Sequence, residues 1–314
     1  MIRRFFALLI LMTMLLPTPL RAQDQAALWA QDLRLAVVAE RIMGANVHLC
    51  RNTMPLTGLI LHSRDQYGAA QAGWFANGQV AVAQVLPASA AERAGIQLGD
   101  GVLAVGGLAV DDLALAAGYP RRDAVFDVLA TSSAPVALTI RRAATVEVRE
   151  LAAPTGCRAL VEVLTDGARI SRADGRVVQI SSGMVTLLDD NGLAATFAHE
   201  LAHAVLEHRR RLNAGDLSAE DIRRLSRQVE LEADLLSVHL LANAGYDPQI
   251  APQMWESAIG RALNSGFLRS RRYASRRERA RELRREIADY LTARPLPSPA
   301  THLLELRDRP FANQ

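Results

Sequence analysis

The sequence predicts an α+β fold in which a β-rich half precedes a mainly helical half with a small sheet. Two observations carry this prediction. Between residues 57 and 151, short apolar runs alternate with Gly, Pro, Asn and Asp, which is typical of strands joined by turns. From Leu193 onward, apolar residues recur at helical spacing almost as far as the proline-rich stretch 293–300. With 314 residues the chain is long enough for two domains, each with its own core.

The individual elements follow from local patterns. Apolar residues at helical spacing predict a helix over 26–43, and Ser89–Ala94 reads as a short helix that Gly95 stops. Gly192 is expected to end a short helix or turn, and Asp174-Gly175 is a hairpin signal. The expected strands are 59–61, 80–86, 102–105, 136–140 and 146–151 in the first half, and 160–164, 168–171 and 177–180 in the second.

The charge pattern gives no reason to expect a nucleic-acid partner. All 36 basic residues are arginine, and the formal net charge is only +3. An arginine-rich stretch, 269–285, is interleaved with Glu278 and Glu282. This favours a solvated helix with ion pairs one turn apart over a patch that binds lipid or nucleic acid.

The N-terminus predicts export from the cytoplasm. Arg3-Arg4 precedes an apolar run from Phe5 to Leu16, and a small residue follows at Ala22. This is the order of a secretory signal peptide over residues 1–22, with the mature chain beginning near Gln23. We therefore expect a periplasmic or secreted protein. An uncleaved N-terminal anchor is the alternative, and peripheral membrane association is a further possibility.

The two cysteines are candidates for a disulfide. Cys50 precedes the β-rich half and Cys157 follows it. In an exported protein such a pair can be oxidised. Closing so long a loop stabilises the fold by roughly 4 kcal/mol in the chain-entropy description. Two buried free thiols are the alternative.

The β-rich half resembles a bacterial PDZ domain. The resemblance rests on "VAVAQVLPASAAERAGIQLGDGVLAVGGLAV", residues 80–110, in which Gly95, Gly99 and Asp100 stand where the PDZ pattern needs them. It implies a domain over 57–152 that binds peptide C-termini. Such a peptide adds to the sheet as a strand, and backbone N–H groups hold its carboxylate. The resemblance assigns this role to Gly58, Leu59 and Ile60. Another small β-rich domain, or a groove that docks on the rest of the chain, is the alternative.

The stretch His199-Glu200-Leu201-Ala202-His203 is a candidate zinc site. On a helix, His199 and His203 lie on one face, with Glu200 at its edge. A catalytic zinc needs a third protein ligand and an open fourth position. Arg209 stands where the metzincin class has its third histidine, which excludes that class. His208 is one residue off that position, and we expect a structural role for it.

A second helix offers the third ligand. Glu230 and Asp234 are one helical turn apart and share a face, whereas Glu232 points to the opposite side. We expect Glu230 to bind the metal and Asp234 to hydrogen-bond the free nitrogen of a ligand histidine, His199. A solvated acidic stripe is the alternative. His239 is expected to be structural, and His48, His62 and His302 belong to no constellation.

"HELAH", "ELEAD" and "AGYDP" follow one another in an order that resembles the CAAX prenyl proteases, the mitochondrial Oma-type protease and the BepA-like periplasmic proteases. The resemblance covers about residues 160–290 and implies a zincin fold with Zn²⁺ bound by two histidines and a glutamate. It implies that strand 177–180 is the edge that pairs with substrate. One departure is that Tyr273-Ala274 replaces the family's His-Pro pair before Ser275. Tyr273 is a candidate donor to the oxyanion.

The sequence therefore predicts an exported zinc endopeptidase with Glu200 as general base. The expected domain limits are a helical segment 23–56, the PDZ-like domain, a peptidase domain 153–295 and a tail 296–314. The resemblance implies misfolded envelope proteins as substrates. One alternative is a zinc-stabilised chaperone or adaptor without proteolysis. Another is a peptide-binding module whose helical half is only a scaffold.

Overall fold

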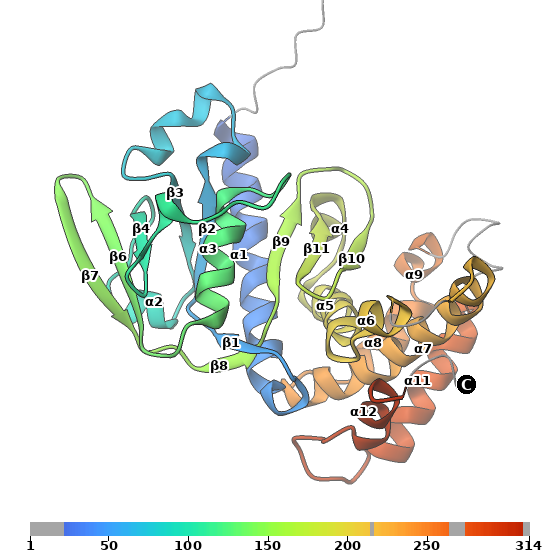
Figure 1. Ribbon diagram of the computed structural model, residues 1–314. Helices are drawn as coiled ribbons and strands as arrows, with labels where there is room; N and C mark the ends of the chain where they lie inside the picture. Colours follow the sequence, from blue (N-terminus) through green and yellow to red (C-terminus); the bar gives the residue numbers. More distant parts are fainter. Residues whose placement is uncertain (1–21, 214–216, 264–273, 310–314) are drawn as a thin grey trace, which may run out of the picture.

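The computed structural model describes residues 22–213, 217–263 and 274–309. Residues 1–21 of the predicted signal peptide, and Tyr273, lie outside the described residues. No helix within the described ranges combines the length and the apolar character needed to cross a bilayer. Figure 1 shows a β-rich half and a mainly helical half, with the long helix α1 (Ala22–Ala45) between them.

Helix α1 extends beyond both ends of the predicted helix 26–43. It buries Leu35 and Ile42 in the core of the helical half. Its other neighbours include strands of the β-rich half. One helix therefore packs against both halves and fixes how they sit.

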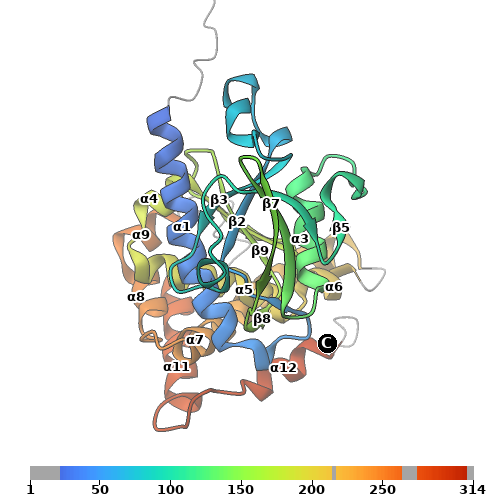
Figure 2. The ribbon, with the colours of Figure 1, turned by 90° about the vertical axis from the view of Figure 1, so that its left-hand side faces the viewer.

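The β-rich half is an antiparallel sheet in the order β2-β3-β4-β6-β7, with β5 beside β4. Figure 2 views it from the side of β7. Valines and leucines on one face of the sheet form its core together with the inner face of α3. The strands and the short helix α2 that were expected in this half are confirmed. The bounds are β2 Leu59–Ser63, β3 Val80–Val85, α2 Ala90–Arg93, β4 Gly101–Val105, β5 Leu108–Ala109, α3 Arg121–Thr131, β6 Val136–Arg142 and β7 Thr145–Leu151.

A buried aspartate holds the turn before β4, and its loss should be measurable. The carboxylate of Asp100, 1% exposed, accepts from Gln97 N at 2.8 Å and from Arg142 Nε at 2.7 Å. We expect Asp100→Ala to lower the free energy of unfolding by about 2–3 kcal/mol, because hydrogen bonds to a charged group are lost. Urea denaturation measures this. The exposed Asp111→Ala is the control, with a change within about 0.5 kcal/mol, and equal effects of the two variants would contradict the prediction.

A disulfide and a two-stranded sheet tie the two ends of the β-rich half together. Cys50 and Cys157 are bonded, with their Cα atoms 5.5 Å apart. Beside them β1 (Thr53–Pro55) pairs with β8 (Thr155–Cys157). The chain therefore enters and leaves this half at one place.

The helical half carries a three-stranded sheet in the order β10-β11-β9. Strand β11 (Val177–Ser181) is parallel to β9 (Leu160–Leu164) and antiparallel to β10 (Ser171–Ala173). Two expectations are wrong here. The strand expected at 168–171 begins only at Ser171. Before it, the Ser181 hydroxyl donates to Ala168 O and accepts from Ile170 N, and a single backbone bond joins Ser181 N to Ile170 O. The predicted edge strand 177–180 is central, and β10 is the edge.

Helices make up the rest of the helical half. Gly192 does not end a helix. It lies in the first turn of α5, where its N–H is capped by the Asp189 carboxylate at 2.8 Å. The bounds are α4 Ser182–Leu187, α5 Asp190–Val205, α6 His208–Asn213, α7 Ala219–Asn243, α8 Ile250–Glu256, α9 Ala258–Leu263, α11 Arg276–Tyr290 and α12 Thr301–Arg307, and the short 3-10 helices are Val47–Leu49, Arg64–Gln66, Ala69–Phe75 and Val110–Asp112.

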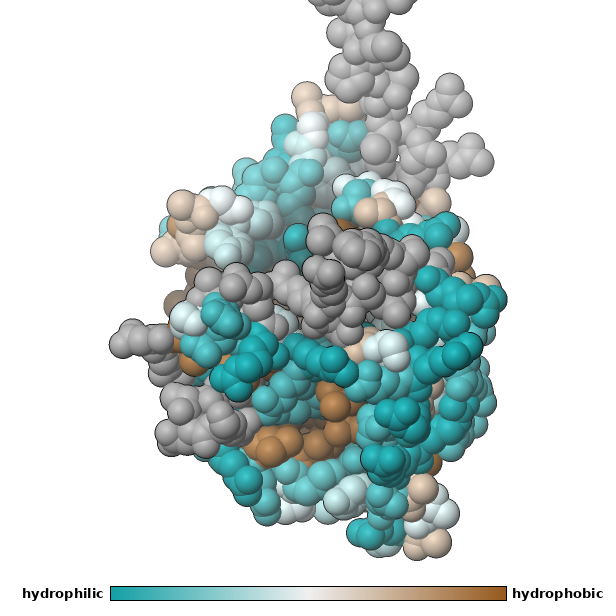
Figure 3. Space-filling model, turned by 90° about the vertical axis from the view of Figure 1, so that its right-hand side faces the viewer, coloured by the Kyte–Doolittle hydropathy of each residue, from teal (hydrophilic) through white to brown (hydrophobic). Residues whose placement is uncertain are grey.

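The arginine-rich helix α11 has the ion pairs expected of a solvated helix. Arg284 pairs with Glu256 of α8 at 2.5 Å, and Arg285 pairs with Glu282 at 3.0 Å. Figure 3 shows that hydrophilic residues cover most of the described surface on the side of the helical half. Arg284 and Arg285 therefore have carboxylate partners on α8 and α11, as expected of a solvated helix with ion pairs.

Candidate metal centre

Helix α5 presents both histidines of the predicted motif on one face. Its opposite face buries Leu193, Phe197 and Leu201, which are at most 1% exposed. This packing fixes the rotation of the helix, so His199 and His203 must point toward α7. Each histidine side chain is 16% exposed, which leaves room for a ligand.

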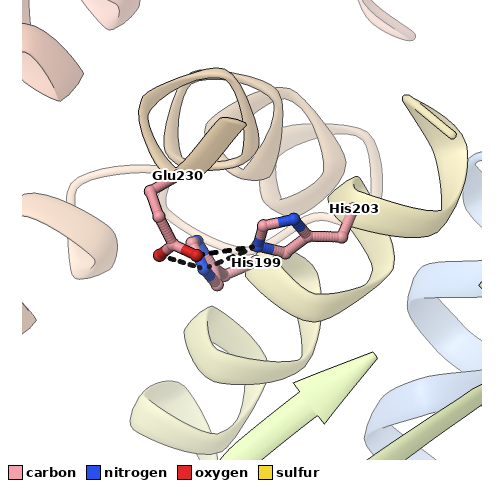
Figure 4. Close-up of side chains that lie close together, drawn as sticks. All are labelled: His199, His203 and Glu230. Carbon is pink, nitrogen blue, oxygen red and sulfur yellow. Dashed lines mark hydrogen bonds and ion pairs between the residues drawn. The ribbon is translucent and has the colours of Figure 1, made fainter. Parts of the chain in front are cut away.

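Three donor atoms converge between α5 and α7 (Figure 4). His199 Nε2 and His203 Nε2 are 3.2 Å apart. Glu230 Oε2 lies 3.5 Å from the first nitrogen, and its Oε1 lies 3.6 Å from the second. Ligands bonded to one tetrahedral zinc at about 2.0–2.1 Å stand roughly 3.3 Å apart. The spacing and the chemistry of these donors therefore fit a single zinc ion.

The electrostatics of the three residues favour a cation. Burial disfavours charge on His199, but the carboxylates of Asp234 and Glu230 outweigh it and raise the pKa of this histidine to about 10. Burial and the His199 charge lower the pKa of His203 to about 3. Burial opposes ionisation of Glu230, yet its bond to His199 and the nearby positive charges lower its pKa to about 2. The carboxylates thus hold a proton on His199, and zinc, which needs both imidazoles neutral and Glu230 ionised, would displace that proton when it binds.

Asp234 lies behind His199, as expected for a residue that orients a ligand. Its Oδ1 is 3.0 Å from His199 Nδ1, an ion-pair distance without the angle of a good hydrogen bond. Arg279 grips the same carboxylate, with Nη2 2.7 Å from Oδ1. The guanidinium also stacks 3.7 Å above the Trp255 ring. Sequence reasoning assigned no role to Arg279 because its partners are distant along the chain.

Glu200 lines an open cavity next to the donors. The cavity measures about 320 Å³, and its wall includes Ser171, Arg172 and Ala173 of the edge strand β10. Burial raises the pKa of the Glu200 carboxyl above its usual value. A buried carboxylate beside a candidate zinc, facing a free strand edge, can exchange a proton with a molecule bound in the cavity.

A second histidine cluster has the geometry of hydrogen bonds. Glu286 Oε1 lies 2.8 Å from His239 Nε2 and 2.7 Å from His302 Nε2. Ser298 Oγ lies 2.7 Å from His239 Nδ1. These distances are shorter than the separation of ligands on one zinc. The cluster ties α12 to α7 and α11, and the expectation that His302 belongs to no constellation was wrong.

The predicted peptide-binding residues are covered by the chain itself. The Gly58 N–H donates to Glu40 Oε1 of α1 at 2.9 Å. A cavity beside Leu59 and Ile60 is also lined by Met43 of α1. Burial raises the pKa of Glu40 to about 7. A side-chain carboxylate thus occupies a backbone N–H that the PDZ resemblance assigns to a peptide carboxylate.

This geometry defines a zincin-like centre, with two histidines from α5 and a glutamate from α7. Residues 170–220 match the model of Peptidase family M48. The match begins just before β10 and includes His199, Glu200 and His203, and it ends before Glu230. A comparison with curated proteins finds no match to the chain. The family match supports a metallopeptidase activity.

Proposed function

We propose that this protein is a zinc-dependent endopeptidase. The convergence of His199, His203 and Glu230 at the spacing of zinc ligands is the observation that carries the proposal. Glu200 beside them and the open edge of β10 supply the base and the surface that hydrolysis of a polypeptide needs. A site kept only for structure needs neither.

The chain's own residues would act as follows. Zinc, when bound, lowers the pKa of a water molecule and polarises the scissile carbonyl. Glu200 accepts the proton of the attacking water and returns it to the leaving amine. Strand β10 pairs with the substrate backbone and holds it over the donors. Asp234, held by Arg279, keeps the His199 ring in place. Tyr273 stays a predicted donor to the oxyanion.

We further propose that the protein acts outside the cytoplasm on misfolded envelope proteins. The Cys50–Cys157 disulfide supports an oxidising compartment. The basic and apolar N-terminal stretch supports export. The β-rich half serves as a PDZ-like module whose groove α1 closes, so a peptide C-terminus must displace Glu40 to enter.

Metal analysis of the purified protein tests the proposal. We expect one zinc per chain, and we expect chelation to abolish cleavage of an unfolded protein. Readdition of zinc at 100 times its Kd should restore cleavage and stabilise the fold by about 2.7 kcal/mol, seen as a rise in Tm. If the purified protein holds no zinc and its Tm does not change when chelator is added, the proposal is overturned. That result would favour the alternative of a peptide-binding module whose helical half is only a scaffold.

A further inference from the structure

We infer that His208 is a positioning residue that orients the candidate ligand His203 through an imidazole-to-imidazole hydrogen bond anchored on Glu232. The inference rests on the proposed metal centre. It gives a role to two side chains, His208 and Glu232, that the proposed reaction does not use.

The contacts form a short chain of hydrogen bonds. His203 Nδ1 lies 2.8 Å from His208 Nδ1, and the two rings meet edge to face at 73°. His208 Nε2 lies 3.1 Å from Glu232 Oε2. Arg211 Nη1 donates to the same oxygen at 2.5 Å, and Gln228 Nε2 donates to Oε1 at 2.8 Å. His208, Arg211 and Glu232 are each 3% exposed, so water does not replace these partners.

These hydrogen bonds permit only one arrangement of protons on His203 and His208 when His203 binds a metal. His203 Nε2 faces the other donors and must offer a lone pair, so its Nδ1 carries the proton. That N–H needs an acceptor, and His208 Nδ1 is the atom within reach. The proton of His208 then sits on Nε2 and is donated to the ionised Glu232. Each bond fixes the tautomer of the next ring, and the result is a neutral His203 with its lone pair toward the metal.

The backbone turn after α5 places His208. Helix α5 ends at Val205, and Glu207 adopts φ +52, which reverses the chain so that His208 opens α6 beside His203. Glu207 is held there by Arg51 at 3.3 Å and by an ion pair with Arg210. A non-glycine residue at positive φ costs energy, so the surrounding contacts must hold this turn.

The two candidate ligand histidines, His199 and His203, are each backed by a carboxylate that is paired with an arginine. Behind His199 stands Asp234 with Arg279, and behind His208 stands Glu232 with Arg211. The two arrangements differ in that Asp234 lies directly beside His199, whereas the His208 ring stands between His203 and Glu232. Alternate faces of α7 supply Glu230 to the metal and Glu232 to the relay. Outer partners of metal-bound histidines raise ligand basicity and hold the ring, and their loss costs 10–100-fold in metal affinity.

The test compares zinc affinity in His208 variants of the full chain. We expect His208→Leu to weaken zinc binding by about 10–100-fold, measured by competition with a chromogenic chelator. Cobalt(II) substituted into the site should show an altered visible spectrum, because the His203 ring is freed. The matched control is His239→Leu, which removes an equally buried histidine of α7 that is remote from the donors. The His239→Leu variant should bind zinc within about threefold of the wild-type affinity, a change much smaller than the loss expected for His208→Leu.

A pair of polar variants keeps the test decisive if His208→Leu does not fold. His208→Asn keeps an acceptor near the position of Nδ1, whereas His208→Gln keeps a polar group toward Glu232 only. We expect the asparagine variant to bind zinc more tightly than the glutamine variant. Equal zinc affinities in the wild type and His208→Leu, or in the asparagine and glutamine variants, would overturn the inference. A wild-type protein without zinc would instead defeat the proposed function.

Discussion

Glu200→Gln is expected to lower kcat for cleavage of an unfolded protein by about two to four orders of magnitude. The amide is nearly isosteric with the carboxylate but cannot accept a proton from water. KM should change little, because the amide keeps the size of the side chain and Glu200 is not one of the converging donors. Zinc content should stay at one per chain. Steady-state cleavage of a quenched fluorescent peptide, together with metal analysis, measures all three quantities.

The same variant separates the peptidase from the chaperone alternative. Glu220→Gln, an exposed position near the start of α7, is the matched control and should leave kcat unchanged. If Glu200→Gln keeps its zinc and cleaves as fast as the control, the peptidase proposal is lost. Retained holdase activity in an inactive Glu200→Gln protein would show only that the two activities are separable.

Replacing both cysteines by alanine should lower the free energy of unfolding by about 4–5 kcal/mol. Cys50 and Cys157 are 107 residues apart, and a loop of that length loses much conformational entropy when its ends are joined. The bond also protects the short β1–β8 ladder that closes the β-rich half. Urea denaturation of the oxidised protein and of the double variant measures the difference.

Reductant provides the control for this prediction. Dithiothreitol should shift the urea midpoint of the wild type toward that of the double variant and should not move the variant itself. A midpoint of the oxidised wild type that is equal to that of the double variant would contradict a stabilising disulfide.

The fold was predictable where local signals act alone. Alternating apolar residues and glycine turns set the strands of the β-rich half, and the short helix expected before Gly95 is α2, with Ser89 as its N-cap. The errors lie where a side chain competes with the backbone. Ser181 bonds the segment 168–170 and delays β10, and Asp189 caps the turn that keeps Gly192 inside α5. The central place of β11 depends on its long-range pairing with β9, which no local pattern reveals.

In the candidate site, too, the arrangement of residues within one helix was predictable, whereas contacts between helices were not. Helical periodicity was enough to pair His199 with His203 on one predicted helix and Glu230 with Asp234 on another. The step that joined Glu230 to the two histidines came from the need for a third ligand and from the family resemblance. Arg279 lies 45 residues from Asp234, and Glu232 lies 24 residues from His208. These contacts depend on how helices pack, and the pattern of a single sequence does not specify that packing.

Helix α1 contacts both the predicted peptide-binding segment of the β-rich half and the segment just before α5. The carboxylate of Glu40 accepts a hydrogen bond from the Gly58 N–H. Nearer the start of the same helix, Arg34 donates to Val185 O and Leu188 O, both at 2.7 Å, just before α5. On the proposed function, a peptide carboxylate that displaces Glu40 would remove a contact of the same helix that braces the start of α5. Linkage is reciprocal, so a groove ligand that changes zinc or substrate affinity by some factor has its own affinity changed by the same factor.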